Sequence, residues 1–160
     1  MNFTLNTFKR PTMDKTEKAL SYFDNKYNCA QSVLVAFAEE CGLKADEALK
    51  VSSAFGGGMG RQQHTCGAVT GAAMALGLKF GKGENDSDDK KLLTYDKTIE
   101  LFAEFAKQNG SSVCLELLDN LVMRNENDLE LINKNNLFHT RCRKYVADAV
   151  RITENIITNH

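Results

Sequence analysis

The chain has 160 residues, of which 42% are hydrophobic and 26% charged, and its formal net charge is −1. This length and composition suit one globular domain, so we expect residues 1–160 to form a single domain with a flexible N-terminal segment at residues 1–13. The near-zero charge offers no basic surface to nucleic acid. No apolar run is long enough for membrane insertion.

Cysteine usage indicates a reducing compartment. Five cysteines are too few for a disulfide-dense scaffold of this length, and residues 1–13 lack the apolar segment of a signal peptide. We therefore expect a cytoplasmic protein. In that setting, cysteine clusters serve metal binding or catalysis more often than they form structural disulfides.

Apolar residues at helical spacing predict helices throughout the first half of the chain. Residues 14–23 form a short amphipathic helix, and residues 29–41 form a second one that Gly42 ends. A third helix over residues 45–55 runs into the segment Phe55-Gly-Gly-Gly-Met-Gly60. The next helix begins at Cys66 and continues to about residue 80.

The helix that begins at Cys66 has one face with almost no side chains. Gly67, Gly71 and Ala75 lie four residues apart and share this face. A glycine inside a helix costs about 1 kcal/mol relative to alanine, so two of them need a packing or functional reason. Such a face lets another backbone or a bulky cofactor approach closely, and we expect Gly67 and Gly71 to make room for a cofactor.

The second half is also predicted to be helical. Residues 81–91 form an exposed polar linker, residues 92–106 a long helix, and residues 114–121 a short one. Residues 123–139 are rich in asparagine and are interpreted as a variable insertion. A last helix begins at Cys142. Since no segment alternates like a strand, we predict an all-α fold, a single-domain bundle of about six to seven helices.

Four of the five cysteines are predicted to begin helices, because each follows a residue that is favoured as an N-cap. The pairs are Asn28 before Cys29, Thr65 before Cys66, Ser111 and Ser112 before Cys114, and Thr140 before Cys142. A thiol in the first turn faces the positive end of the helix dipole, which favours the thiolate. Cys41 instead ends a helix, and we assign it to the core.

The four cysteines could converge on one site, since each begins an apolar stripe of its helix. No Cys-x-x-Cys pair is present, so any such site is assembled by the fold. Taken singly, each cysteine is also compatible with a buried small hydrophobic residue. Cys66 is the predicted catalytic thiol, because Arg61 and His64 are near it in sequence and Gly67 leaves its sulfur accessible.

An ordered set of motifs extends from about residue 15 to residue 155. It consists of Asn28-Cys29-Ala30-Gln31-Ser32-Val33, Phe55-Gly-Gly-Gly-Met-Gly-Arg61, Thr65-Cys-Gly-Ala-Val-Thr-Gly71 and two later cysteines, Cys114 and Cys142. This set resembles the C_GCAxxG_C_C family of redox-active proteins. The four cysteines that name the family correspond to Cys29, Cys66, Cys114 and Cys142.

The resemblance implies a cofactor and partners. Members of the family are small bacterial proteins, some encoded near transporters, and a related domain of split-Soret cytochromes is associated with a 2Fe–2S cluster. By this resemblance the four cysteines are metal ligands of a 2Fe–2S or other iron–sulfur cluster, and the partner is an electron-transfer or transporter protein. A homodimer is compatible with the sequence.

Two functions stay open at this point. The first is a redox protein whose four cysteines either hold an iron–sulfur cluster or work as a thiol/disulfide system. The second is a non-catalytic helical adaptor, stabilised by zinc or free of cofactors, that binds a protein such as a transporter. We expect no haem, because Cys-x-x-Cys-His is absent. We expect no nucleotide, because the glycine run fits neither phosphate-binding pattern.

Overall fold

The computed structural model describes residues 13–160, and within them the fold is all-α, as the sequence predicts. The helices are α1 (Lys15–Asp24), α2 (Cys29–Ala38), α3 (Ala45–Ser52), α4 (Gly56–Met59), α5 (Gly67–Phe80), α6 (Asp88–Asn109), α7 (Cys114–Leu117), α8 (Glu126–Lys134) and α9 (Arg143–Thr158). Short 3₁₀ turns follow α2 (η1, Glu39–Cys41) and α3 (η2, Ser53–Phe55), and a π-helical turn (η3, Phe138–Cys142) leads into α9. The predicted flexible segment lies outside the described residues except for Met13.

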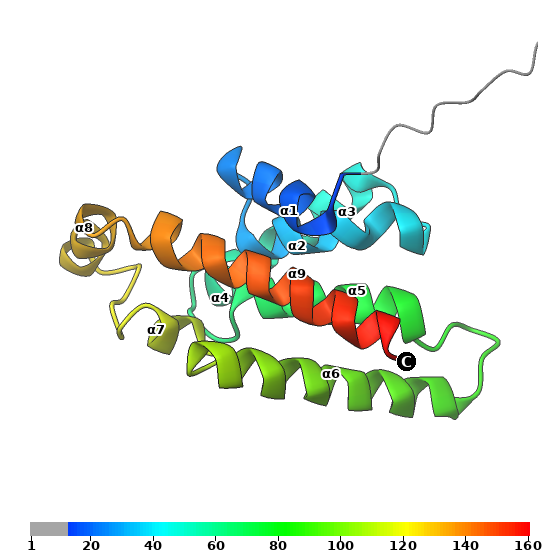
Figure 1. Cartoon of the computed structure of the whole chain (residues 1–160). Helices are drawn as coiled ribbons and strands as arrows, with labels where there is room; N and C mark the ends of the chain where they lie inside the picture. Colours follow the sequence, from blue (N-terminus) through cyan, green and yellow to red (C-terminus); the bar gives the residue numbers. More distant parts are fainter. Residues whose placement is uncertain (1–12) are drawn as a thin grey trace, which may run out of the picture.

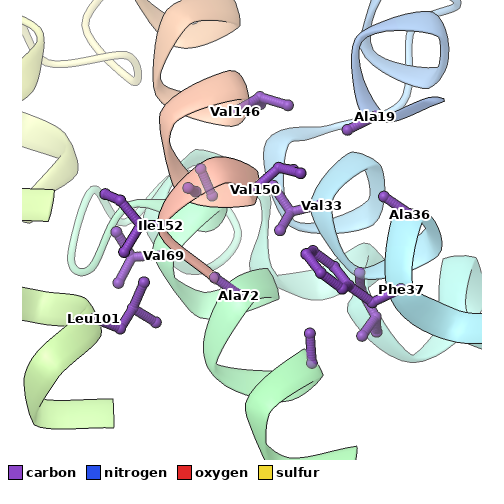
Figure 2. Packing of buried hydrophobic residues seen from close by; sticks show 14 of the residues in the cluster. Ala19, Val33, Ala36, Phe37, Val69, Ala72, Leu101, Val146, Val150 and Ile152 are labelled. Atoms are coloured by element: carbon purple, nitrogen blue, oxygen red, sulfur yellow. The ribbon is translucent and has the colours of Figure 1, made fainter. Parts of the chain in front are cut away.

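Helices α2 and α5 pack against each other at the centre of the bundle. α2 also contacts α1 and α3, while α5 also contacts α6 and α9. The long helix α6 extends along one side of the molecule (Figure 1). The main core combines Val33 and Phe37 of α2 with Val69 of α5 and Val150 of α9, all fully buried (Figure 2). This core fixes the position of the N-terminal end of α2 relative to that of α5.

Two glycines of α5 allow this close contact with α2. A Cβ atom at Gly71 would lie 2.6 Å from the carbonyl oxygen of Ala30, and one at Gly67 would lie 3.2 Å from the Cβ atom of Cys29. The small face predicted from the sequence is therefore used for helix packing. For Gly71 the close neighbour is α2 itself, and its expected contact with a cofactor stays a prediction.

Helix α6 presents apolar residues to solvent. Leu92, Tyr95 and Ile99, whose spacing predicts this helix, are 55%, 58% and 67% exposed. The opposite face of α6 carries the buried Leu101 and Phe105, which pack onto α5 and α9. The sequence thus identifies the helix correctly, but the first part of its apolar stripe lies outside the core, and only farther along does Phe102 pack against it.

The asparagine-rich segment 123–139 is folded. Asn125 caps α8 by accepting a hydrogen bond from the amide of Asp128 at 3.1 Å. Ile132 of α8 and Leu137 are buried in a second, smaller core that also contains Cys114 and Cys142. Its interpretation as a variable insertion stays a prediction.

No helix in the described part of the chain is long and apolar enough to cross a membrane.

Candidate functional site

A pocket of about 940 Å³ is lined by residues of α4 and α7, among others. Figure 1 shows these two short helices near the same end of the bundle. Four of the five cysteines line the pocket: Cys29, Cys66, Cys114 and Cys142. Three of them are buried, and Cys29 is partly exposed. Cys41 lies apart in η1, where it is also partly exposed, so its assignment to the core is wrong.

A capping box fixes the position of Cys29 at the start of α2, as the sequence predicts. The Asn28 side chain accepts a hydrogen bond from the amide of Gln31 at 3.0 Å, and the Gln31 side chain accepts one from the amide of Asn28 at 3.0 Å. The Asn28 side-chain amide also donates to the carbonyl of Ser53 at 2.9 Å. These bonds anchor the first turn of α2 to η2.

A pair of extended segments places Cys66 beside Cys114. Thr65 and Val113 form an isolated antiparallel bridge, the only strand-like pairing within residues 13–160. The amide of Cys66 donates to the carbonyl of Ser112 at 2.8 Å, and the amide of Cys114 donates to the carbonyl of His64 at 2.7 Å. The bridge therefore brings two cysteines together that are far apart in sequence.

This bridge also changes the predicted caps. Thr65 is not an N-cap, because it belongs to the bridge and Cys66 itself is the N-cap of α5. The amides of Ala68 and Val69 point at the Cys66 sulfur and favour its thiolate. Val113 is the N-cap of α7.

The turn before α5 depends on Gly58 and Gln63. Gly58 has φ of +65°, and a Cβ atom there would lie 2.8 Å from the Cβ atom of Cys114. Gln63 is 5% exposed; its side chain donates to the carbonyl of Leu121 at 2.9 Å and accepts from the amide of Met123 at 2.7 Å. Gln63 thus joins this turn to the segment after α7. Sequence reasoning missed it, since a lone glutamine in a polar loop carries no pattern.

Cys142 is the residue immediately before α9, close to the predicted start of the last helix, but it does not lie in a free first turn, because the helical backbone already begins with η3. It ends the π-helical turn η3 and continues directly into α9. The side chain of Thr140 donates to the carbonyl of Asn136 within the same turn and does not cap α9. A π-helical turn widens the backbone locally and is frequent at functional sites. Here the π-helical turn ends at Cys142, which lines the pocket.

The electrostatic surroundings distinguish Cys29 from the other three cysteines. The Cys142 thiol can donate a hydrogen bond to the Cys29 sulfur, which lowers the pKa of Cys29 even though burial opposes this shift. The same interaction, together with burial, raises the pKa of Cys142. Burial raises the pKa of Cys66, and it raises the pKa of Cys114 to about 12; a charge on Cys29 adds to both shifts.

These directions favour Cys29 as the group that most readily becomes a thiolate. The prediction that Cys66 is the most reactive thiol loses its electrostatic support, and a catalytic role for Cys66 stays a prediction. Of the loop residues expected near Cys66, Arg61 lines the pocket. His64 is exposed and contributes through its carbonyl group.

The donor set limits what the pocket could hold. Within residues 13–160, no three His, Cys, Asp or Glu side chains are grouped closely enough to bind one metal ion. A group with several metal atoms distributes its ligands more widely, and four cysteines are the usual donor set of 2Fe–2S and 4Fe–4S clusters. Gly56, Gly57 and Gly67 in the lining leave space beside the sulfurs. The four thiols are therefore donors of the type that an iron–sulfur cluster takes.

Comparison with known proteins gives two matches. A family model described as "Putative redox-active protein (C_GCAxxG_C_C)" matches residues 27–156. An uncharacterized protein of Archaeoglobus fulgidus is 29% identical over 152 residues, which cover 88% of this chain and 94% of that relative. No solved structure matches the chain at comparable significance. All four pocket cysteines lie inside the range that the family model matches.

Proposed function

The chain belongs to the C_GCAxxG_C_C family, and on this premise we propose that it is a redox protein whose pocket cysteines act as one centre. The observation that carries this proposal is that four cysteines line one pocket while the fifth lies outside it. In the form we favour, Cys29, Cys66, Cys114 and Cys142 are the ligands of an iron–sulfur cluster. Such a cluster, when bound, takes up and releases an electron.

The residues around the pocket have separate tasks in this proposal. The buried positions of Cys66, Cys114 and Cys142 keep water away from three of the sulfurs. The amides of Ala68 and Val69 stabilise negative charge on the Cys66 sulfur. Cys29 is the only partly exposed residue of the four, and we assign the exchange of electrons with a partner to its side of the pocket.

A thiol/disulfide system is the second candidate, and the contact between Cys29 and Cys142 favours it. A thiolate at Cys29 would attack one sulfur of a disulfide substrate, forming a mixed disulfide and releasing the other half as a thiolate. Cys142 would then displace the remaining half after losing its proton. The protein would end with a Cys29–Cys142 disulfide, and the substrate would end as two reduced thiols.

Anaerobic purification followed by a visible spectrum and by iron and sulfide analysis separates these candidates. A brown protein with iron and acid-labile sulfide supports the cluster. A colourless, metal-free protein contradicts the cluster; oxidation of that protein should then produce a Cys29–Cys142 disulfide, which mass spectrometry of proteolytic fragments detects. A colourless protein with stoichiometric zinc, or one that forms no disulfide, would instead support the non-catalytic adaptor.

A further inference from the structure

The pocket extends beyond the four sulfurs toward solvent. Its outer part is lined by the turn after α1, by the glycine-rich loop and by η3, and these segments contribute the acidic and basic side chains Asp24, Lys26, Arg61 and His139. Its volume of about 940 Å³ is in the range typical of sites for small molecules. A site for contact with a protein surface alone would not need this depth.

The outer part of the pocket carries net positive charge. Arg143 neutralises the single carboxylate, because its Nε and Nη2 atoms donate to the Asp24 oxygens at 2.9 and 3.0 Å. Lys26 and Arg61 have no acidic partner within salt-bridge distance among residues 13–160. Two cations therefore face the pocket without a counter-charge.

Two helix N-termini add to this positive field. α2, with ten residues, and α5, with fourteen, both begin at residues that line the pocket. Each helix dipole places partial positive charge at its N-terminus, and such ends attract anions.

We propose that the outer pocket binds a small organic anion that acts as an electron acceptor, and that this molecule, rather than the surface of another protein, is reduced while the four-cysteine centre is oxidised. This inference rests on the proposed redox function and names its substrate class. It holds for either form of the centre, since the anion approaches the sulfurs through the same opening. Cys29 is partly exposed as a residue, whereas the other three pocket cysteines are buried.

Two aromatic disulfides of different charge test this inference on the full-length Cys41→Ser protein, reduced, freed of metal and kept anaerobic, so that only the four pocket thiols can react. The probes are 5,5′-dithiobis(2-nitrobenzoic acid), which carries two carboxylates, and 4,4′-dithiodipyridine, which is uncharged at neutral pH. In each reaction a cysteine thiolate attacks the probe, a mixed disulfide forms, and one coloured thiol is released. The ratio of the two rates is divided by the same ratio for 2-mercaptoethanol, which removes the intrinsic difference between the probes.

We expect the normalised ratio to favour the dianionic probe by about tenfold at low ionic strength and to fall as salt is added. The double variant Lys26→Gln/Arg61→Gln should lose most of this preference, because its rate with the dianionic probe should fall far more than its rate with the uncharged probe. Lys107→Gln is the matched control, because Lys107 is an exposed lysine on α6 outside the pocket. It should behave like the unaltered protein, and circular dichroism verifies that all variants are folded.

A normalised ratio near one, or a preference that the double variant retains, would overturn the inference. It would also be overturned if neither probe reacted until urea unfolded the protein, since the pocket would then exclude small molecules. The proposed redox function is judged separately by the visible spectrum and the iron content. The failure of one can therefore be distinguished from the failure of the other.

Discussion

Replacing Gly71 by alanine measures how closely α2 and α5 must pack beside the cysteine pocket. The new methyl group would lie 2.6 Å from the carbonyl oxygen of Ala30 and 3.1 Å from the Cβ atom of Val33. Both neighbours are fully buried in α2, so neither can move unless that helix shifts. Overpacking of this kind costs about 1–3 kcal/mol, whereas alanine raises the helix propensity by about 1 kcal/mol. We therefore expect the free energy of unfolding to fall by up to about 2 kcal/mol.

Gly77→Ala is the matched control in the same helix. No atom lies within 4 Å of a Cβ atom at Gly77, so this variant should gain stability, by up to about 1 kcal/mol. Urea unfolding followed by circular dichroism gives both free energies. Thermal melting gives the same order, with a shift of about 2–4 °C for each kcal/mol in a domain of this size. If Gly71→Ala were as stable as Gly77→Ala, the close-packing argument would be refuted.

Further predictions concern the exposed helix face, the thiols and one ion pair. Ile99→Lys should leave the melting temperature almost unchanged, whereas Leu101→Lys should prevent folding; equal effects would mean that the face of α6 is assigned wrongly. In the metal-free, reduced protein, Cys29 should be alkylated before the other pocket cysteines, and its advantage should grow as the pH falls below the usual thiol pKa, because its own pKa is lowered. The Arg143 guanidinium lowers the pKa of Asp24, so the pair stabilises the fold above the unfolded-state pKa of that carboxyl and loses this effect as the pH falls through the folded-state pKa. Asp24→Asn should therefore lower the free energy of unfolding by at most about 1 kcal/mol near neutral pH and leave it unchanged in strong acid. Urea titrations at both pH values measure this difference.

Local signals explain how much of the fold the sequence predicts. Apolar spacing identifies helices because most of them bury one side, and the capping box of Asn28 correctly places the start of α2. The same spacing does not say which stripe is buried, so it gives no warning that Leu92, Tyr95 and Ile99 of α6 are exposed. Exposure depends on which helices cover α6, and that is set by tertiary packing.

The site was harder to predict, because its geometry comes from contacts between distant residues. The bridge between Thr65 and Val113 replaces the cap expected at Thr65, and no local pattern announces it. Thr140 resembles an N-cap, yet the π-helical turn continues past it into α9. The pKa order of the thiols depends on the approach of Cys142 to Cys29, which exists only in the folded chain.

The central claim is that four cysteines act together and the fifth does not. Its most direct test is iron content and visible absorption, measured on anaerobically purified protein and on the five single Cys→Ser variants. We predict that the unaltered protein and Cys41→Ser bind iron and absorb alike, and that Cys29→Ser, Cys66→Ser, Cys114→Ser and Cys142→Ser each lose or alter this absorption while staying folded by circular dichroism. The claim would be contradicted if Cys41→Ser lost the absorption, or if any of the other four variants kept it unchanged.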